Sequence, residues 1–299
     1  MNKCIILCMV CNDSHFIREM NVIKESWGKD ILDGNYPNLD IWFYTAGNKN
    51  YIDIDNHIIY VIADDSLYGT WEKTYKAIQI LNTYIKYDFI FRTNTSNVIN
   101  IKLLNNLISS HLNPNQNELW SVDFIYDRTK NKDNIVISPI GAAILCSRHI
   151  FNLITNDYIN NIEYYKNKYS YHEVKIDDVA IGTIINEINT NTTINIIYRH
   201  FKGAFYKSFP IEKKYSSYEY DLGNTHLDIN IFKNVLNVRI KTIKLDDNFS
   251  LIDSLNDCIK ICEVSNLYKS NDITKEELDN ISKMIIDNSY SYEIRIVED

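Results

Sequence analysis

Residues 4–11 read CIILCMVC, an unbroken apolar run that ends at the polar residues Asn12, Asp13 and Ser14. A short run without polar alternation is typical of a strand that is buried on both faces. Asp and Ser are residues that favour the start of a helix. The stretch therefore predicts a buried strand followed directly by a helix, which is the opening unit of a parallel α/β sheet.

The same alternation of strands and helices continues through the first half of the chain. Apolar residues at helical spacing predict helices at 15–27, stopping at Gly28, and at 69–86. Apolar runs predict further strands at 39–45, 57–62 and 87–93. This order of strands and helices is typical of an α/β sheet with helices on its faces.

The second half predicts further elements and a change of character near its end. We expect helices at 99–110, 147–154 and 177–188, and strands at 119–125, 135–137, 141–146 and 195–198. Beyond about residue 245 the pattern is helical, and Thr274 and Glu277 form a capping box. We therefore expect one α/β domain over residues 1–244 and a small helical C-terminal appendage over 245–299.

Composition excludes several classes of protein. The chain has 299 residues, 45% apolar and 23% charged, which is ordinary globular composition. A net charge of −8 argues against a nucleic-acid binder or a protein of anionic membranes. No run approaches the roughly 20 apolar residues of a membrane span. Over-used Asn, Ile, Lys and Tyr, with few Gly and Pro, indicate an AT-rich genome, microbial or viral.

The cysteines lack the paired spacing of a structural zinc site. They are Cys4, Cys8, Cys11, Cys146, Cys258 and Cys262. We interpret all six as buried or half-buried thiols in a reducing compartment. We therefore expect a soluble cytoplasmic protein, acting in the host cytoplasm if it is viral; no oligomeric state follows from the sequence.

Common signatures of nucleotide hydrolases, dinucleotide enzymes, esterases and zinc proteases are absent. Instead, five segments stand in a particular order. They are Val22–Gly28, Asp65–Thr74, Tyr87–Asn100, Pro139–Arg148 and Ile176–Gly182. In this order and spacing, over about residues 4–205, the chain resembles the fringe and β-1,3-galactosyltransferase family of glycosyltransferases.

The resemblance implies a GT-A fold, which is a Rossmann-like mixed sheet flanked by helices. It also implies an inverting hexosyltransferase that moves a sugar from a nucleotide-sugar donor, a UDP-sugar, to a glycan or glycoprotein hydroxyl. Within the second segment it assigns Lys73 to the donor site.

The third segment departs from the family at the Asp-Asp-Asp motif, whose carboxylates hold a divalent cation, usually Mn²⁺, against the donor diphosphate. Here Asn94, Thr95 and Ser96 take those positions. A hard cation needs anionic oxygen ligands, which Asn and Ser do not supply. We therefore expect the usual metal site to be weakened or lost, and donor binding to depend only weakly on Mn²⁺. The alternative interpretation is a simple polar strand end.

A later basic cluster offers positive charge in place of the metal. Arg199, His200 and Lys202 follow the fifth segment by about twenty residues, where the family often has a His at the metal or diphosphate site. His200 matches this His by position and is a candidate metal ligand. The Arg199 guanidinium can donate hydrogen bonds to two phosphate oxygens at once. Arg92 is the next candidate to supply this positive charge. A solvated strand edge is the alternative.

Two adjacent acids, Asp177 and Asp178, open a predicted helix, where free N–H groups favour negative charge by themselves. The resemblance implies that Asp178 is the general base and Asp177 its orienting neighbour. It also implies that Gly141 and Ala142 let the backbone approach a sugar. We expect Trp27 and Trp71 to pack helices on the sheet.

Three interpretations of function remain open. The first is the glycosyltransferase, favoured by Asp178. The second is a non-catalytic nucleotide- or carbohydrate-binding relative, favoured by Asn94 and Ser96. The third is an unrelated α/β protein.

Overall fold

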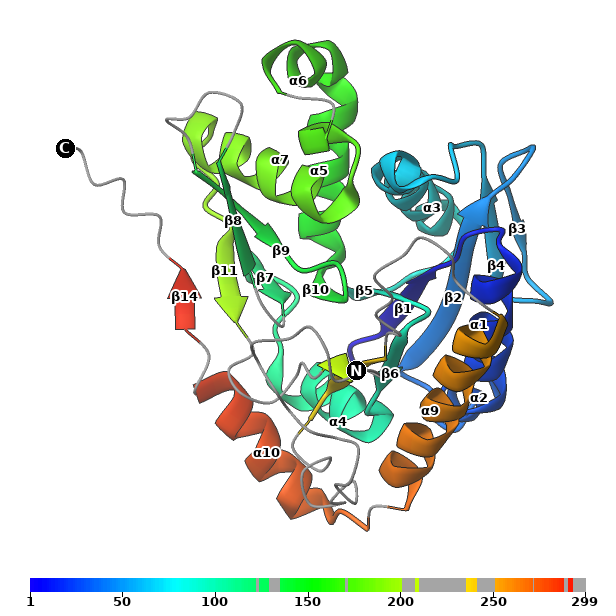
Figure 1. Ribbon diagram of the computed structural model, residues 1–299. Coiled ribbons are helices and arrows are strands. Elements are labelled where there is room, and N and C mark those ends of the chain that lie inside the picture. Colours follow the sequence, from blue (N-terminus) through cyan, green and yellow to red (C-terminus); the bar gives the residue numbers. More distant parts are fainter. Residues whose placement is uncertain are drawn as a thin grey trace.

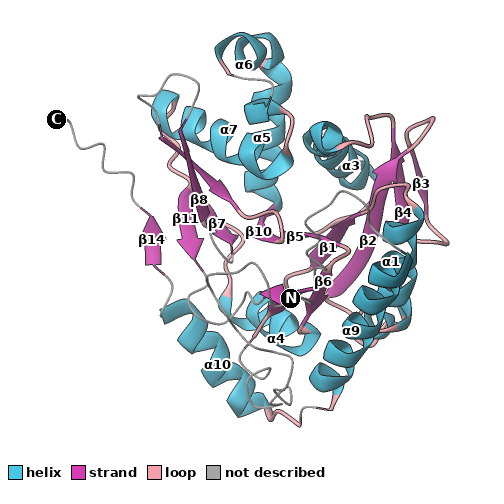
Figure 2. Cartoon of the chain, viewed as in Figure 1, coloured by secondary structure: helices cyan, strands magenta, loops and turns pink. Residues whose placement is uncertain are grey.

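The opening apolar run forms strand β1 (Cys4–Met9), which lies inside a nine-stranded sheet of order β14-β11-β7-β10-β5-β1-β2-β4-β3. In this computed structural model the described residues are 1–121, 124–128, 135–169, 172–200, 208–209, 235–240, 251–270, 272–287 and 290–292. The sheet is mixed and flanked by helices, so the expected α/β class is confirmed (Figure 2).

The other strands of the large sheet are β2 (Leu39–Ala46), β3 (Tyr51–Asp53), β4 (Ile58–Val61), β5 (Phe89–Asn94), β7 (Glu118–Ser121), β10 (Ala143–Ser147), β11 (Ile197–His200) and β14 (Tyr290–Tyr292). A small sheet holds β6 (Asn97–Ile99), β12 (Ser208–Phe209) and β13 (Asn237–Ile240), and a hairpin pairs β8 (Phe124–Arg128) with β9 (Ile135–Pro139).

The helices are α1 (Ser14–Glu25), α2 (Lys29–Leu32), α3 (Thr70–Tyr84), α4 (Ile101–Asn106), α5 (Arg148–Asn160), α6 (Ile162–Lys168), α7 (Asp177–Asn191), α9 (Leu251–Lys269) and α10 (Lys275–Asp287). Short turns of helix are η1 (Leu67–Gly69), η2 (Leu107–His111) and η3 (His172–Val174). Across the described residues, no helix combines the length and apolar character needed to cross a bilayer.

Side-chain alternation along β1 explains why the run is apolar throughout. Cys4, Ile6 and Cys8 lie in one buried cluster, and Ile5 and Leu7 lie in the other. The first cluster is covered by α1, α2 and α9, and the second by α3, α5 and α7 (Figure 1). Because both faces are covered by helices, a strand with no polar face is the stable choice.

Strand order places a topological switch beside β1. The parallel strands occur along the chain in the order β1, β2, β4 and β5, but their order across the sheet is β4-β2-β1-β5. The chain thus moves outward through β2 and β4, then returns to the opposite side of β1. In open α/β sheets, ligands bind in the crevice beyond the carboxyl ends of strands at such a switch.

The expected elements agree with the structure apart from a few differences. The expected strand over 119–125 is wrong, because β7 ends at residue 121 and β8 begins at 124. The helix expected over 99–110 begins at 101 and ends in a π turn, η2. Strands β3, β6 and β13 were not predicted, since runs of three or four residues carry too little periodicity.

Several residue-level predictions are settled as well. Trp27 and Trp71 are buried at 2% and 1% exposure, as expected. The capping box is confirmed, because Glu277 N–H donates to Thr274 Oγ1 and Thr274 N–H donates to Glu277 Oε2. The cysteines are free thiols, but Cys262 is exposed rather than buried, because it faces outward from α9.

The C-terminal helices share the core of the sheet. Ile261 and Val264 of α9 and Ile285 of α10 belong to the same buried cluster as β1. Helix α9 packs against α1, and α10 packs against α4. The division expected at 244/245 falls in residues 241–250, outside the described residues, and stays a prediction.

Gly182 allows α7 to lie directly on β9. A Cβ at this position would be 2.5 Å from the Ile137 carbonyl oxygen and 2.7 Å from Ser138 Oγ. Gly→Ala inside a helix normally stabilises by about 0.5–1 kcal/mol. We expect Gly182→Ala instead to destabilise by roughly 1–3 kcal/mol in urea unfolding, because the helix must move off the strand. Thr190→Ala, at an exposed site on the same helix, is the control and should change the free energy of unfolding little. A Gly182→Ala variant as stable as the wild type would contradict this packing.

Candidate active site

A cavity of about 500 Å³ lies beyond the carboxyl ends of β1 and β5, at the topological switch. Its wall combines segments distant in the sequence, represented by Met9, His15, Asp65, Ser96, Arg239 and Asp257. The volume falls within the range of about 300–1,000 Å³ that is typical of small-molecule sites.

A buried polar cluster lies behind this wall and joins three of the sequence segments. The Arg92 guanidinium forms an ion pair with Asp177 and donates a hydrogen bond to the Gly141 carbonyl oxygen. The Gly141 N–H donates to Asp178 Oδ2 at 3.3 Å. Strand β5, the turn before β10 and the first turn of α7 are therefore held together by one network.

Two residues of the cavity wall contact the cluster. Thr70 Oγ1 accepts a hydrogen bond from Asp177 N–H at 3.1 Å, and Met9 Sδ lies 3.6 Å from Arg92 Nη2. Thr70 belongs to the second sequence segment, so four of the five segments meet here. The first segment is not part of this network, since its Trp27 is buried in the core.

Asp178 has the electrostatics of a base that titrates near neutrality. Burial and the neighbouring Asp177 raise its pKa to about 6, while Arg92 and the N–H groups of Val179 and Gly141 oppose the rise. A carboxylate with a raised pKa is a better proton acceptor than an ordinary one. It remains ionised at pH 7.

Arg92 is held by the protein itself. Its side chain is 1% exposed. Burial opposes its charge, but Asp177, Tyr44 and Asp178 together outweigh burial and raise the pKa of Arg92 above its usual value. The structure thus places this reserve phosphate ligand in an internal ion pair rather than on the cavity wall.

Lys73 also forms an ion pair within the protein. It is fully buried and its Nζ lies 2.8 Å from Asp65 Oδ1, with Cys11 Sγ at 3.5 Å. Asp65 and Cys11 line the cavity, so Lys73 lies one layer behind it.

The cavity is also lined by Asn94, Thr95 and Ser96. Their side chains form hydrogen bonds with one another and with α1. Ser96 Oγ donates to Asn94 Oδ1 at 2.9 Å, and Thr95 Oγ1 donates to Glu19 Oε2. Three neutral groups already used in hydrogen bonds do not fit the ligand set of a hard cation. The loss of the usual metal site at Asn94, Thr95 and Ser96 stays a prediction.

Arg199 and His200, the described residues of the basic cluster, do not line the cavity. Arg199 pairs with Glu118, with Nη2 and Oε1 2.9 Å apart, at the start of β7. Lys202 lies outside the described residues.

His200 lies at the same edge of the sheet as the cavity but three strands away from β5. It pairs with Ser121, which pairs with Ile144, which pairs with Arg92. At about 4.8 Å per strand, His200 is roughly 14 Å from Arg92.

Gly141 and Ala142 pack tightly against β5. A Cβ on Gly141 would lie 2.9 Å from Arg92 Nη1 and 3.2 Å from Asp178 Oδ2. The Ala142 carbonyl accepts a hydrogen bond from Thr93 Oγ1 at 2.8 Å. Small residues are therefore needed here to bring Arg92 and Asp178 together.

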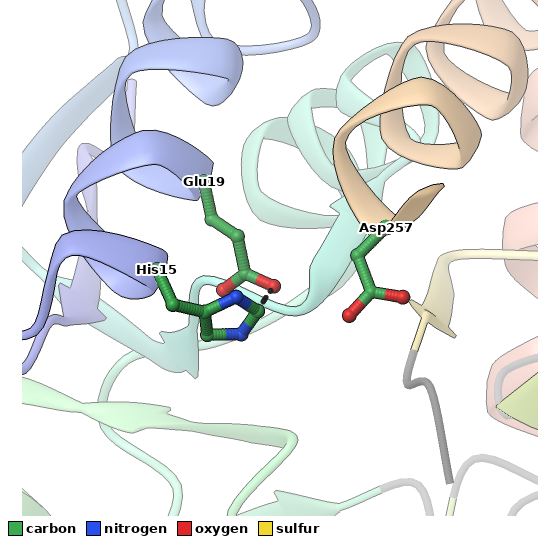
Figure 3. Close-up of side chains that lie close together, drawn as sticks. All are labelled: His15, Glu19 and Asp257. Carbon is green, nitrogen blue, oxygen red and sulfur yellow. Dashed lines mark ion pairs between the residues drawn. The ribbon is translucent and has the colours of Figure 1, made fainter. Parts of the chain in front are cut away.

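Sequence analysis missed a second cluster, formed by His15, Glu19 and Asp257 on the cavity wall (Figure 3). Burial raises the pKa of Glu19 to about 8; the Thr95 hydrogen bond opposes this rise and Asp257 adds to it. His15 and Glu19 are four residues apart on α1, a spacing that could have been noticed. Asp257 carries no local signal, since it comes from α9.

Fold and cavity together define an α/β protein with a cavity of small-molecule size at a topological switch. No protein-family model matches the chain, and no curated protein matches it. Among solved structures, a glycosyltransferase involved in the glycosylation of the major capsid of PBCV-1 aligns with TM-score 0.42 and 9% identity, covering 87% of this chain and 98% of that one. The inositol-1-phosphate CTP transferase from T. maritima aligns with TM-score 0.35 and 11% identity, covering 92% and 98%. Likeness at this level supplies no argument about what this chain binds or transfers.

Proposed function

We propose that the protein is an inverting glycosyltransferase that takes a nucleotide sugar, a UDP-sugar, as donor and a glycan or glycoprotein hydroxyl as acceptor. The observation that carries the proposal is the meeting of four distant segments in one network beside the switch-point cavity. Arg92, Gly141, Asp177 and Thr70 come from those four segments, and the network they form holds Asp178 in place.

The proposed chemistry assigns each group a simple role. Asp178 takes the proton as the acceptor hydroxyl attacks the anomeric carbon, and the nucleoside diphosphate leaves. Asp177, fixed by Arg92, holds the first turn of α7 so that Asp178 keeps its position. The leaving diphosphate gains negative charge, so positive charge must lie beside it. Arg239 lines the cavity and is the guanidinium best placed for this.

A second candidate is a non-catalytic nucleotide- or carbohydrate-binding protein of the same fold. Asn94 and Ser96 favour it, because both line the cavity as neutral groups that hydrogen-bond to each other. Both candidates require a ligand in the same cavity, and they differ only in turnover.

Thermal unfolding with a nucleotide panel tests the shared requirement. A ligand at 100 times its Kd stabilises by about 2.7 kcal/mol, which raises Tm by roughly 5 °C in a protein of this size. We expect UDP to produce such a shift and Ser96→Tyr, which places a bulky ring in the cavity, to abolish it. Ser270→Tyr, at an exposed site, is the matched control and should retain the shift.

Absence of any shift across the panel would overturn the transferase and the nucleotide-binding form of the second candidate. Release of UDP from a UDP-sugar then separates the two candidates. Turnover supports the transferase, and binding without turnover supports the binding protein.

A further inference from the structure

We propose that His15, Glu19 and Asp257 form a binding site for a divalent transition-metal cation on the wall of the cavity. The site does not rest on the proposed function, because its ligand geometry and charge favour a cation with or without a nucleotide. It also differs from the sequence expectation, in which the usual metal site at Asn94–Ser96 is weakened or lost and His200 is the candidate metal ligand.

The ligand atoms are close enough for one ion. His15 Nε2 lies 3.4 Å from Glu19 Oε1, and one ligand atom from each of the three residues lies within 4.8 Å of the others. With metal–ligand bonds of about 2.0–2.2 Å, two ligands of one ion are at most about 4.4 Å apart. The cluster therefore needs to contract by only a few tenths of an ångström.

Two packed helices supply the ligands. His15 and Glu19 are one turn apart on α1, and Asp257 comes from α9, which packs along α1. Figure 3 shows the three side chains converging from these helices toward one point. A ligand set on rigid helices keeps its geometry better than one on loops.

Glu19 supplies a further observation. Its side chain is 1% exposed and Oε2 accepts the Thr95 hydroxyl, whereas Oε1 lies 3.4 Å from His15 Nε2 and accepts no hydrogen bond within the described part of the chain. A buried carboxylate is normally paired, fully hydrogen-bonded or bound to a metal. Thr95 meanwhile fixes the carboxylate orientation, as outer partners of metal ligands do.

The charge of the cavity wall also favours a cation. Four carboxylates line it, and Arg239 is the one guanidinium among its described lining residues. The carboxylates are Asp13, Glu19, Asp65 and Asp257. Asp65 is paired with Lys73, so the wall carries three further acidic side chains against one guanidinium.

The ligand types select the class of ion. Two carboxylates with one imidazole suit Mn²⁺ or Zn²⁺, whereas Ca²⁺ prefers six to eight oxygen ligands. Three protein ligands leave coordination positions for water or an anionic oxygen from the cavity. Mn²⁺ is the better probe, because exposed Cys262 offers Zn²⁺ a competing ligand.

The test measures Mn²⁺ binding to the full-length, chelator-treated protein by loss of the free Mn²⁺ electron paramagnetic resonance signal. We expect saturable binding of one equivalent. Because even outer partners of metal ligands contribute about 10–100-fold in affinity, Asp257→Asn and His15→Ala should each weaken binding by roughly 100-fold or more. His149→Ala and Asp272→Asn, which change exposed residues, should bind as the wild type does.

Three outcomes decide the proposal. Absence of Mn²⁺ binding by folded protein overturns it, and so does binding that both ligand variants retain. Should His15→Ala fail to fold, the near-isosteric Asp257→Asn carries the test. Mn²⁺ binding without any nucleotide shift would leave this site standing while the glycosyltransferase proposal fails.

Discussion

Asp178→Asn is expected to lower turnover of the UDP-sugar by roughly 100-fold or more, the usual scale for a lost general base. The change keeps the size of the side chain and removes its ability to take a proton. Nucleotide affinity should change little, because the proposed contact of Asp178 is with the acceptor hydroxyl and not with the nucleotide. The measurement is kcat with UDP affinity determined alongside, and Asp55→Asn, on the exposed turn before β4, is the control.

The pH profile gives the same prediction a second readout. Since the pKa of Asp178 is raised to about 6, the carboxylate is protonated below that pH and cannot act as a base. The wild-type rate should therefore fall as the pH drops through about 6. The residual rate of Asp178→Asn should lack this fall. Wild-type turnover in the variant would remove Asp178 from the mechanism.

Arg92→Met should destabilise the fold by about 3–5 kcal/mol, the cost of removing one partner from a buried ion pair. The substitution leaves Asp177 charged and buried, at 4% exposure, without its cation. Urea unfolding measures the loss. Arg199→Met breaks a half-buried pair with Glu118 and is the matched control, expected to cost about 0–1 kcal/mol.

A double-mutant cycle identifies the cause of the loss. Arg92→Met combined with Asp177→Asn removes both charges of the ion pair, so the double variant should be more stable than Arg92→Met alone. If the two single effects simply add, the destabilisation comes from lost packing and the ion pair is not its source.

Local pattern accounts for most of the α/β architecture. The run of residues 4–11 specified β1, and helical spacing specified α1, α3 and α7, because burial of both sheet faces acts on every residue of these elements. It also placed Asp177 and Asp178 at the start of a helix. Short strands such as β3 and β6 were missed, since their pairing depends on partners rather than on their own sequence.

The sequence singled out candidate site residues, but it did not identify their partners. Arg92 and Lys73 looked like phosphate ligands, yet the structure pairs them with Asp177 and Asp65. A cationic residue in a sequence motif does not reveal which carboxylate will lie beside it. The answer depends on how α7 and the loop before α3 pack against β5 and β1.

The sequence by itself determined the buried strands, the helices that cover them and the acids at the start of α7, because each follows from neighbouring residues along the chain. Only the tertiary structure decided the strand order that opens the cavity and the approach of Asp257 to His15 and Glu19. The strand order depends on which strands pair across the sheet, and the approach of Asp257 depends on the packing of α9 against α1. Such contacts between distant segments leave no periodic signal in the sequence.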